Sequence, residues 1–184
     1  VTFVPVVSSW VVVSLMWKWI FNPRYGLLNY ALAQIGITGP NWLFDPDTAL
    51  YAIIIAGIWK DIGFITVMFL SGLQGIDESY YEAAKIDGAQ MMQRLRHITL
   101  PLLTPTTFFM AITGVISSFQ VFSSVYVITG GGPRGATDVA VHRIYLRAFE
   151  SFDMGYASAL AWVLFFVIFV FTLLQVWYMR RREE

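Results

Sequence analysis

The sequence has no cysteine and only two histidines, His97 and His142, among its 184 residues. Disulfides and thiolate metal sites are therefore excluded, and a histidine-based metal cluster is not expected. Charge is also scarce, at 13% of residues with a net charge of zero, so no basic field exists that would hold nucleic acid. We expect neither a metal nor a cofactor.

Apolar residues, by contrast, are abundant and make up 57% of the chain. A soluble domain carries about 45–50% apolar and about 25% charged residues. The excess is too large for a surface that faces water, so the composition predicts a membrane protein. The chain begins at Val1 inside an apolar run, and we expect it to be a fragment whose preceding spans are missing.

Four apolar stretches are long enough to cross a bilayer as helices of about 20 residues. They cover residues 1–21, 49–73, 102–127 and 156–178. The last is the clearest, because it carries no charge and ends in Trp177 and Tyr178 before an arginine run. The sequence thus predicts an all-α polytopic membrane protein with a single transmembrane domain over residues 1–184.

Loops over residues 22–48, 74–101 and 129–153 connect these spans. Four spans place both chain ends on one side of the membrane. Lys85, Arg94, Arg96 and the C-terminal arginines fall on that side, so it is predicted to be cytoplasmic. The loops 22–48 and 129–153 are then predicted to lie outside.

The middle loop carries its own helix signals between residues 77 and 101. Ser79 and Glu82 have the spacing of a capping box, which would start a short helix. Gly88 can adopt the left-handed conformation that ends one. Pro101 fits the first turn of the following membrane helix, where its missing N–H has no partner to lose.

The same short helix has a side chain pattern that suits docking to another protein. Ala83 and Ala84 give it a narrow side that can enter a groove, while Glu82 and Asp87 offer charges for pairing. On these residues alone, a solvated interfacial loop remains the alternative interpretation.

The full spacing, Glu-Ala-Ala-x3-Gly-x9-Ile-x-Leu-Pro over residues 82–101, resembles the EAA loop of binding-protein-dependent ABC importer permeases. Residues 17–23, 58–64 and 129–133 are similar to other parts of the carbohydrate branch, which includes the maltose-type permeases. Asp77 departs from the pattern, because that branch usually has proline there, and both residues open helices. The resemblance implies the helical bundle of a type I ABC importer permease, with more spans than the four found here.

In that family the loop is the coupling helix, which sits in a cleft of a cytoplasmic ATPase dimer. The resemblance therefore implies a permease in the bacterial inner membrane that is not itself an enzyme. Its implied partners are the ATPase, a second homologous permease, an extracytoplasmic solute-binding protein, a sugar and membrane lipid. The implied coupling residues are Glu82, Ala83, Ala84, Asp87 and Gly88.

Lys60 and Asp61 lie near the middle of the second predicted span. Each ionised side chain costs about 2.5–3.5 kcal/mol at that depth, so each needs a partner or a water-filled cavity. A substrate pathway and a structural ion pair to another span are both compatible with this. The resemblance favours the pathway and implies these contact residues: Lys60, Asp61, Phe64, Gly114, Ser117, Ser118, Gln120 and Val121.

Two other functions remain as alternatives. A permease for a polyol phosphate or another small polar solute would share the same loop. An ion-coupled secondary carrier would use Lys60 and Asp61 for its ion, but it has no need of the EAA spacing. No Gly-x4-Gly-Lys-Ser/Thr pattern occurs in the sequence, so P-loop hydrolysis of ATP by this chain is excluded.

Overall fold

The computed structural model describes residues 4–183, and all regular secondary structure within them is helical. In chain order the helices are α1 (Val4–Val7), α2 (Trp10–Ile20), α3 (Leu27–Gln34), α4 (Pro46–Gln74), α5 (Glu78–Ile86), α6 (Met91–Arg94), the π-helix η1 (Leu95–Thr99), α7 (Leu100–Leu102), α8 (Thr104–Phe119), α9 (Ser123–Ile128), α10 (Ala140–Tyr145), the π-helix η2 (Leu146–Glu150) and α11 (Met154–Glu183).

Two helices confirm predicted spans and extend them. α4 has 29 residues, about 43 Å at 1.5 Å per residue, which is more than the hydrocarbon core requires. It starts early because Asp45 caps it, accepting from the Asp47 N–H at 3.0 Å, and Pro46 occupies the first helical position. α11 starts where Asp153 accepts from the Tyr156 N–H at 3.1 Å.

The continuous span predicted over residues 1–21 is wrong. Within the described residues it is broken at Ser8 and Ser9, and α2 has only 11 residues, about 16 Å, roughly half of a bilayer core. Ser9 caps α2 by accepting from the Val11 N–H at 3.3 Å, so the chain restarts its helix at this point. Residues 1–3 of the prediction lie outside the described part of the chain.

The span predicted over residues 102–127 is also interrupted. α8 ends at Phe119, and a non-helical stretch separates it from α9, which begins at Ser123. Toward its start, the chain bends by 59° between Met91–Leu102 and Thr104–Phe119. α8 therefore reaches spanning length only together with the bent segment before it.

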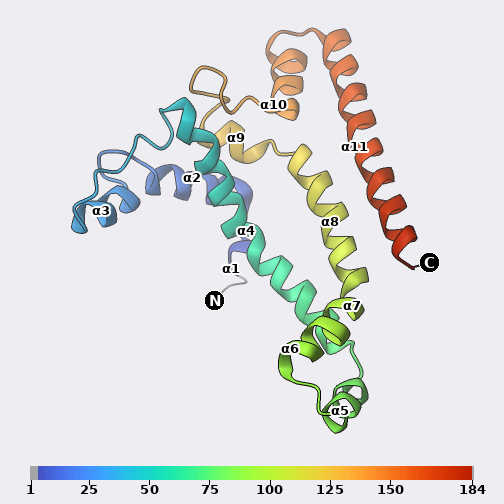
Figure 1. Cartoon of the computed structure of the whole chain (residues 1–184). Helices are drawn as coiled ribbons and strands as arrows, with labels where there is room; N and C mark the ends of the chain where they lie inside the picture. Colours follow the sequence, from blue (N-terminus) through green and yellow to red (C-terminus); the bar gives the residue numbers. More distant parts are fainter. Residues whose placement is uncertain (1–3, 184) are drawn as a thin grey trace.

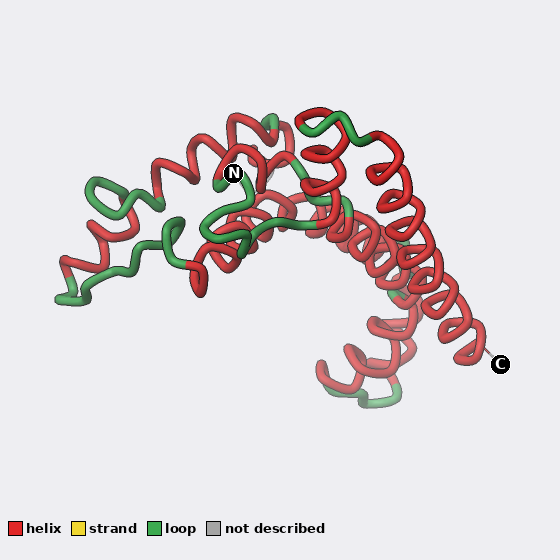
Figure 2. The backbone as a smooth tube through the Cα atoms, turned by 90° about the horizontal axis from the view of Figure 1, so that it is seen from above, coloured by secondary structure: helices red, strands yellow, loops and turns green. Residues whose placement is uncertain are grey.

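The long helices alternate in direction. In Figure 1, α4 descends toward the α5–α6 end, α8 returns, and α11 descends again, while the connections between α8 and α11 lie at the top. From above, the helices follow a curved line and form an open arc (Figure 2). The accessible surface is 12680 Å², whereas a compact monomer of this mass exposes about 9,000 Å². The open arc thus leaves much apolar surface for lipid and for neighbouring helices.

The main apolar core lies where α2, α4 and α9 meet, at the end of the molecule opposite α5. Phe21 and Val125 are fully buried there, and Trp17 stacks on Phe21 with 5.0 Å between ring centroids. This core fixes α9 and the loops around it to the top of α4.

Candidate functional site

The short helix predicted in the middle loop is present as α5, but its start differs from the prediction. The cap is Asp77, whose carboxylate accepts from the Ser79 N–H at 2.9 Å, so the capping box of Ser79 and Glu82 is wrong. The hydrogen bonds from the backbone and side chain of Ser79 lower the pKa of Asp77. Asp77 rather than Ser79 takes the N-cap position of α5, because a carboxylate can accept the same hydrogen bond and also interacts with the positive end of the helix dipole.

The end of α5 agrees with the sequence. Gly88 has φ = 77°, the left-handed conformation expected of it. The Ala89 N–H donates to the Ala84 carbonyl at 2.8 Å and the Gly88 N–H donates to the Lys85 carbonyl at 3.0 Å, which closes the helix. The chain then turns back toward the membrane helices.

The five predicted coupling residues lie on this projecting element, which extends beyond the lower end of α4 (Figure 1). Glu82, Ala83, Asp87 and Gly88 are exposed and Ala84 is half-buried. Neither Glu82 nor Asp87 forms an ion pair within residues 4–183. The helix therefore presents free carboxylates beside small side chains, as a docking element requires.

The return from α5 runs through α6, η1 and α7. Pro101 lies in α7, before the bend, so its predicted place in the first turn of the spanning helix is wrong; Pro105 occupies that turn of α8. At the bend, α8 lies very close to α4. A Cβ on Gly72 would lie 2.7 Å from Thr106 Oγ1 and 2.9 Å from Leu103 Cδ2, so any larger residue there would require these side chains to move.

Lys60 is 7% exposed and its ammonium group is bound within the chain. It donates to the carbonyls of Ser8 at 3.0 Å, Pro5 at 3.1 Å and Val6 at 3.4 Å. The Trp10 ring centroid lies 5.2 Å from the same nitrogen. Lys60 thus donates to three carbonyl groups at the break between α1 and α2, where the regular helical hydrogen bonding is interrupted.

The other predicted pathway residues are placed differently. Asp61 and Phe64 are exposed on α4, and Asp61 does not share the Lys60 position because successive helical residues point about 100° apart. The α8 group lies near the end of that helix, where Gly114, Ser117, Ser118 and Gln120 are exposed. Val121, in the break after α8, packs on the core. α4 and α8 pack against each other, which places the two groups on adjacent helices.

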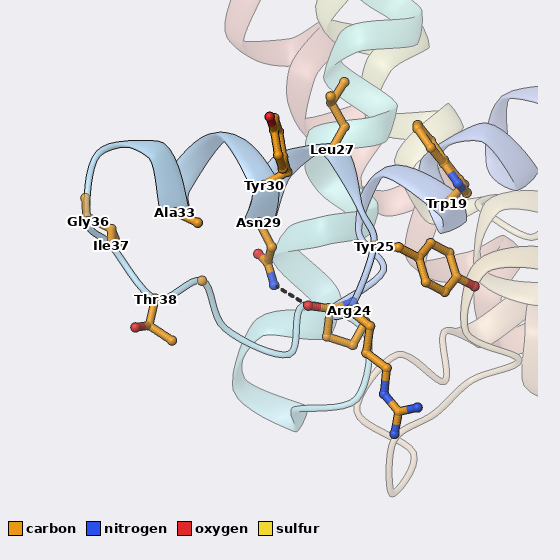
Figure 3. Close-up of a pocket in the computed structure, with 12 residues that line it drawn as sticks. Trp19, Arg24, Tyr25, Leu27, Asn29, Tyr30, Ala33, Gly36, Ile37 and Thr38 are labelled. Atoms are coloured by element: carbon orange, nitrogen blue, oxygen red, sulfur yellow. Dashed lines mark hydrogen bonds between the residues drawn. The ribbon is translucent and has the colours of Figure 1, made fainter.

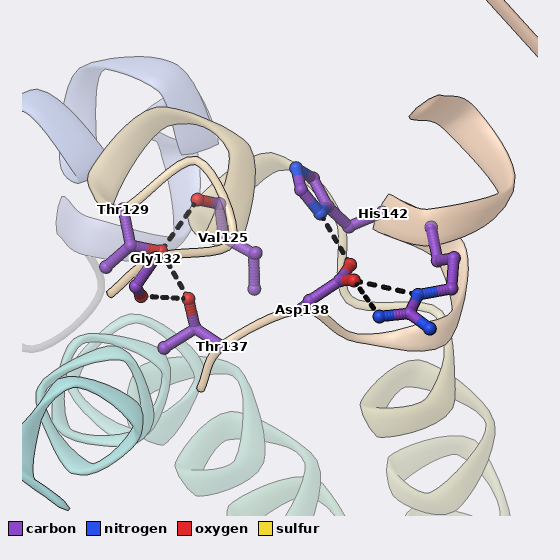
Figure 4. A network of polar contacts seen from close by, with 7 residues as sticks. Val125, Thr129, Gly132, Thr137, Asp138 and His142 are labelled. Atoms are coloured by element: carbon purple, nitrogen blue, oxygen red, sulfur yellow. Dashed lines mark hydrogen bonds and ion pairs between the residues drawn. The ribbon is translucent and has the colours of Figure 1, made fainter. Parts of the chain in front are cut away.

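Sequence reasoning missed a buried polar network in the loop 129–153 (Figure 4). Thr137 is 1% exposed and donates to the Gly132 carbonyl at 2.6 Å, and its hydroxyl lies 2.7 Å from that of Thr129. His142, 2% exposed, lies with Nδ1 2.9 Å from Asp138, and a Cβ on Gly131 would overlap its ring. The only available signal was the spacing of Asp138 and His142.

Asp138 is the charged centre of this network. Its carboxylate accepts from Arg143 Nε at 2.8 Å as well as from His142. Burial raises the pKa of Asp138, but the hydrogen bonds and charges of His142 and Arg143 outweigh it and hold that pKa below its usual value. The same contact raises the pKa of Arg143. The loop is therefore fixed by ionic as well as neutral hydrogen bonds.

A second feature missed from the sequence is an open groove of about 780 Å³ in the loop 22–48 (Figure 3). Trp19, Arg24, Tyr25 and Tyr30 are among its lining residues. Asn29 holds the loop together, accepting from Trp42 Nε1 at 2.7 Å and donating to the Pro23 and Pro40 carbonyls, each at 3.3 Å. Arg24 and the aromatic rings are of the kind found at a membrane–water interface.

Residues 1–184 match the family described as binding-protein-dependent transport system inner membrane component. The trehalose/maltose transport system permease protein MalF of Thermococcus litoralis is 36% identical over 184 residues, which is 100% of this chain and 62% of that protein. The sn-glycerol-3-phosphate transport system permease protein UgpA of Agrobacterium fabrum is 34% identical over 174 residues, 93% of this chain and 58% of its own length. The chain thus spans less than two thirds of these relatives.

A crystal structure of a bacterial ABC transporter involved in the import of the acidic polysaccharide alginate superposes with a TM-score of 0.88 at 26% identity, covering 98% of this chain and 63% of the other. A structure of a bacterial alginate ABC transporter in complex with its alginate pentasaccharide-bound periplasmic protein gives 0.89 at 26% identity. Together with the confirmed helical membrane fold and the exposed α5, these matches show that the chain belongs to the inner membrane permease family of binding-protein-dependent transport systems.

Proposed function

We propose that this chain forms part of the permease subunit of an ATP-driven sugar importer in the cytoplasmic membrane, with ATP hydrolysed on a separate subunit. The proposal is supported by relatives that are named for trehalose/maltose and for sulfoquinovosyl glycerol transport, the latter SmoG at 40% identity over 152 residues. It is also supported by the structural likeness to an alginate importer.

The single observation that carries the proposal is the projecting helix α5. It is capped at both ends and leaves Glu82, Ala83 and Asp87 exposed. It follows α4 after a short turn and is joined to α8 through α6, η1 and α7. Such an element is suited to enter a cleft of an ATPase dimer, with Glu82, Ala83, Ala84, Asp87 and Gly88 in contact. The end of the molecule that carries α5 is then cytoplasmic, and α11 ends toward the same side.

The opposite end is suited to an extracytoplasmic solute-binding protein. There the loop 129–153 is held in one shape by Thr137, His142 and Asp138, so a partner would meet a preformed surface. The open side of the arc leaves room for a second, homologous permease that would complete one pathway.

We propose the exposed residues on α4 and near the end of α8 as sugar contacts. Phe64 offers a ring face for stacking on a sugar, and Ser117, Ser118 and Gln120 offer hydrogen bonds beside an interrupted helix, a feature typical of transport sites. Gly114 has no side chain and so leaves space for the sugar, and Asp61 offers a hydrogen-bond acceptor. Val121 packs on the apolar core beside them. Lys60 takes part by holding the α1–α2 break next to this path.

The test is uptake by the complete transporter, reconstituted with its ATPase and binding protein in liposomes. We expect ATP-dependent sugar uptake that Glu82→Ala and Gly88→Val strongly reduce. Full ATP-coupled uptake in both variants would overturn the coupling mechanism. Uptake that survives ATP depletion but stops with the ion gradient would favour a secondary carrier instead.

A polyol phosphate is the second candidate cargo, because UgpA relatives are named for sn-glycerol-3-phosphate. The two cargo classes are separated by thermal stabilisation of the assembled transporter across a panel of sugars and polyol phosphates. Stabilisation by phosphates alone would replace the sugar assignment.

A further inference from the structure

Helix α5 is connected to the helices after it by a hydroxyl–hydroxyl contact in addition to the main chain. Tyr81 Oη lies 3.0 Å from Thr99 Oγ1, across 18 residues of sequence. Thr99 is 9% exposed and Tyr81 is half-buried, so water competes little for this hydrogen bond. Thr99 also donates to the Arg94 carbonyl at 3.5 Å. Either hydroxyl can be the donor in the Tyr81–Thr99 bond.

Within residues 4–183, no other side-chain hydrogen bond joins α5 to a segment beyond Gln90. The covalent route runs through Gly88 and the short extended stretch before α6. The Tyr81–Thr99 bond therefore adds a direct connection from α5 to η1 that does not pass through this stretch.

Thr99 lies at the junction that connects the α5–α6 segment with α8. It ends the π-helix η1 and is followed by α7 and by the 59° bend into α8. Leu103, in the bend, is 6% exposed and meets Gly72 of α4. A displacement of Thr99 is therefore delivered to α8 beside its tight contact with α4. π-helical segments are rare and are often found at functional sites.

We propose that the Tyr81–Thr99 hydrogen bond is the positioning contact that transmits movement of α5 to α8. This inference rests on the proposed function, because it assigns the route by which the ATPase drives the permease. Tyr81 and Thr99 are positioning residues, since they act through the helix they hold rather than on the sugar.

The experiment measures ATP hydrolysis and sugar uptake on the same liposomes that contain the complete transporter. We expect Tyr81→Phe and Thr99→Val each to lower the sugar transported per ATP by about two- to tenfold, the range that one net hydrogen bond supports. The double variant should lose no more than either single variant, because both remove the same bond.

The chain supplies matched controls. Tyr80 is 55% exposed and makes no side-chain hydrogen bond within the described residues, and Thr66 donates only within α4, to the Ile62 carbonyl at 2.7 Å. Tyr80→Phe and Thr66→Val should keep the transport-to-hydrolysis ratio of the unmodified transporter. An unchanged ratio in Tyr81→Phe and Thr99→Val would overturn the inference while leaving the proposed function intact. Absence of ATP-dependent uptake in the unmodified transporter would instead overturn the proposed function.

A second measurement covers variants that assemble poorly. The chain has no cysteine, so Tyr81→Cys with Thr99→Cys, in otherwise cysteine-free partners, can be bridged by a short bis-maleimide linker. The bridge should restore the ratio that the two substitutions lower. A bridged transporter that still hydrolyses ATP without uptake would contradict transmission through this contact.

Discussion

The two ends of the molecule are built in different ways. At the end that carries the loop 129–153, called the outer end after the proposed orientation, Phe21, Val125 and Thr137 are almost completely buried, and an ionic network fixes the loop between α9 and α11. At the opposite end, α5 has no buried residue, and its outward face carries carboxylates without ion pairs in the described chain. The outer end holds its shape by its own contacts, whereas the elbow formed by α5 and η1 depends on few contacts and is open to a partner.

The largest loss of stability is expected when the buried contact of Lys60 is removed. Lys60→Met removes the ammonium donor that the Pro5, Val6 and Ser8 carbonyls share at the α1–α2 break, so we expect the free energy of unfolding to fall by about 2–4 kcal/mol. The measurement is the thermal unfolding of the assembled transporter. Lys18→Met is the control, because exposed Lys18 donates to a single carbonyl, that of Val127, at 3.2 Å. Equal losses in the two variants would contradict the role given to Lys60.

Two neighbouring glycines sharpen the comparison within the outer loop. Gly131 has φ = 81° and its Cβ would lie 2.6 Å from His142 Cε1, whereas Gly130 has φ = 60° and open space around it. Both alanine variants lose about 1–2 kcal/mol from the left-handed backbone. Gly131→Ala should lose a further ~1–3 kcal/mol by overpacking. Thermal midpoints measured side by side test this, and similar midpoints would show that His142 moves aside freely.

Gly88, in the elbow, resembles Gly130: its φ is 77°, and no atom lies within 4 Å of the position that a Cβ would take. Gly88→Ala should therefore lower stability by only about 1–2 kcal/mol. Because the substitution redirects the chain after α5, uptake per ATP should fall by more than the stability loss explains. Parallel measurements of unfolding and uptake decide this, and a variant with normal uptake would remove Gly88 from the coupling element.

The smallest effect concerns pH. The pKa of Asp138 is lowered in the folded state, so its stabilising contribution is complete above its unfolded-state pKa, near 3.9. That contribution is lost as the pH falls through the lower folded-state pKa. Asp138→Asn should therefore destabilise the outer loop at neutral pH and lose its disadvantage in strong acid. The measurement is hydrogen exchange of residues 129–142 in the variant and in the unmodified chain, at neutral pH and in acid. A difference between the two proteins that stays the same at both pH values would contradict the prediction.

The parts of the fold that could be predicted from the sequence are those fixed by residues close together along the chain. α4 and α11 follow from uninterrupted hydropathy, and the end of α5 follows from Gly88. The break at Ser8 and Ser9 could not be predicted, because it is stabilised by Lys60, more than fifty residues away. The break after α8 likewise depends on α9 packing into the core with α2 and α4.

The candidate site divides in the same way. The spacing of residues 82–101 predicted the element that we propose for coupling, and the short helix α5 is found there, since its ends depend on residues close to it in the sequence. Tyr81 and Thr99 were not found, because their contact forms only after the chain has folded back through α6 and η1. Lys60 was recognised as an expensive charge, but its carbonyl partners belong to a distortion that hydropathy does not report.

The close approach at Gly72 has a mechanical consequence. Since α8 meets α4 there through Leu103 and Thr106, the two helices are held at a short separation just after the bend. A larger residue at position 72 would press on both side chains and separate α4 from α8 at this level. It would thereby change the packing of the two helices without touching any residue proposed for coupling or for sugar contact.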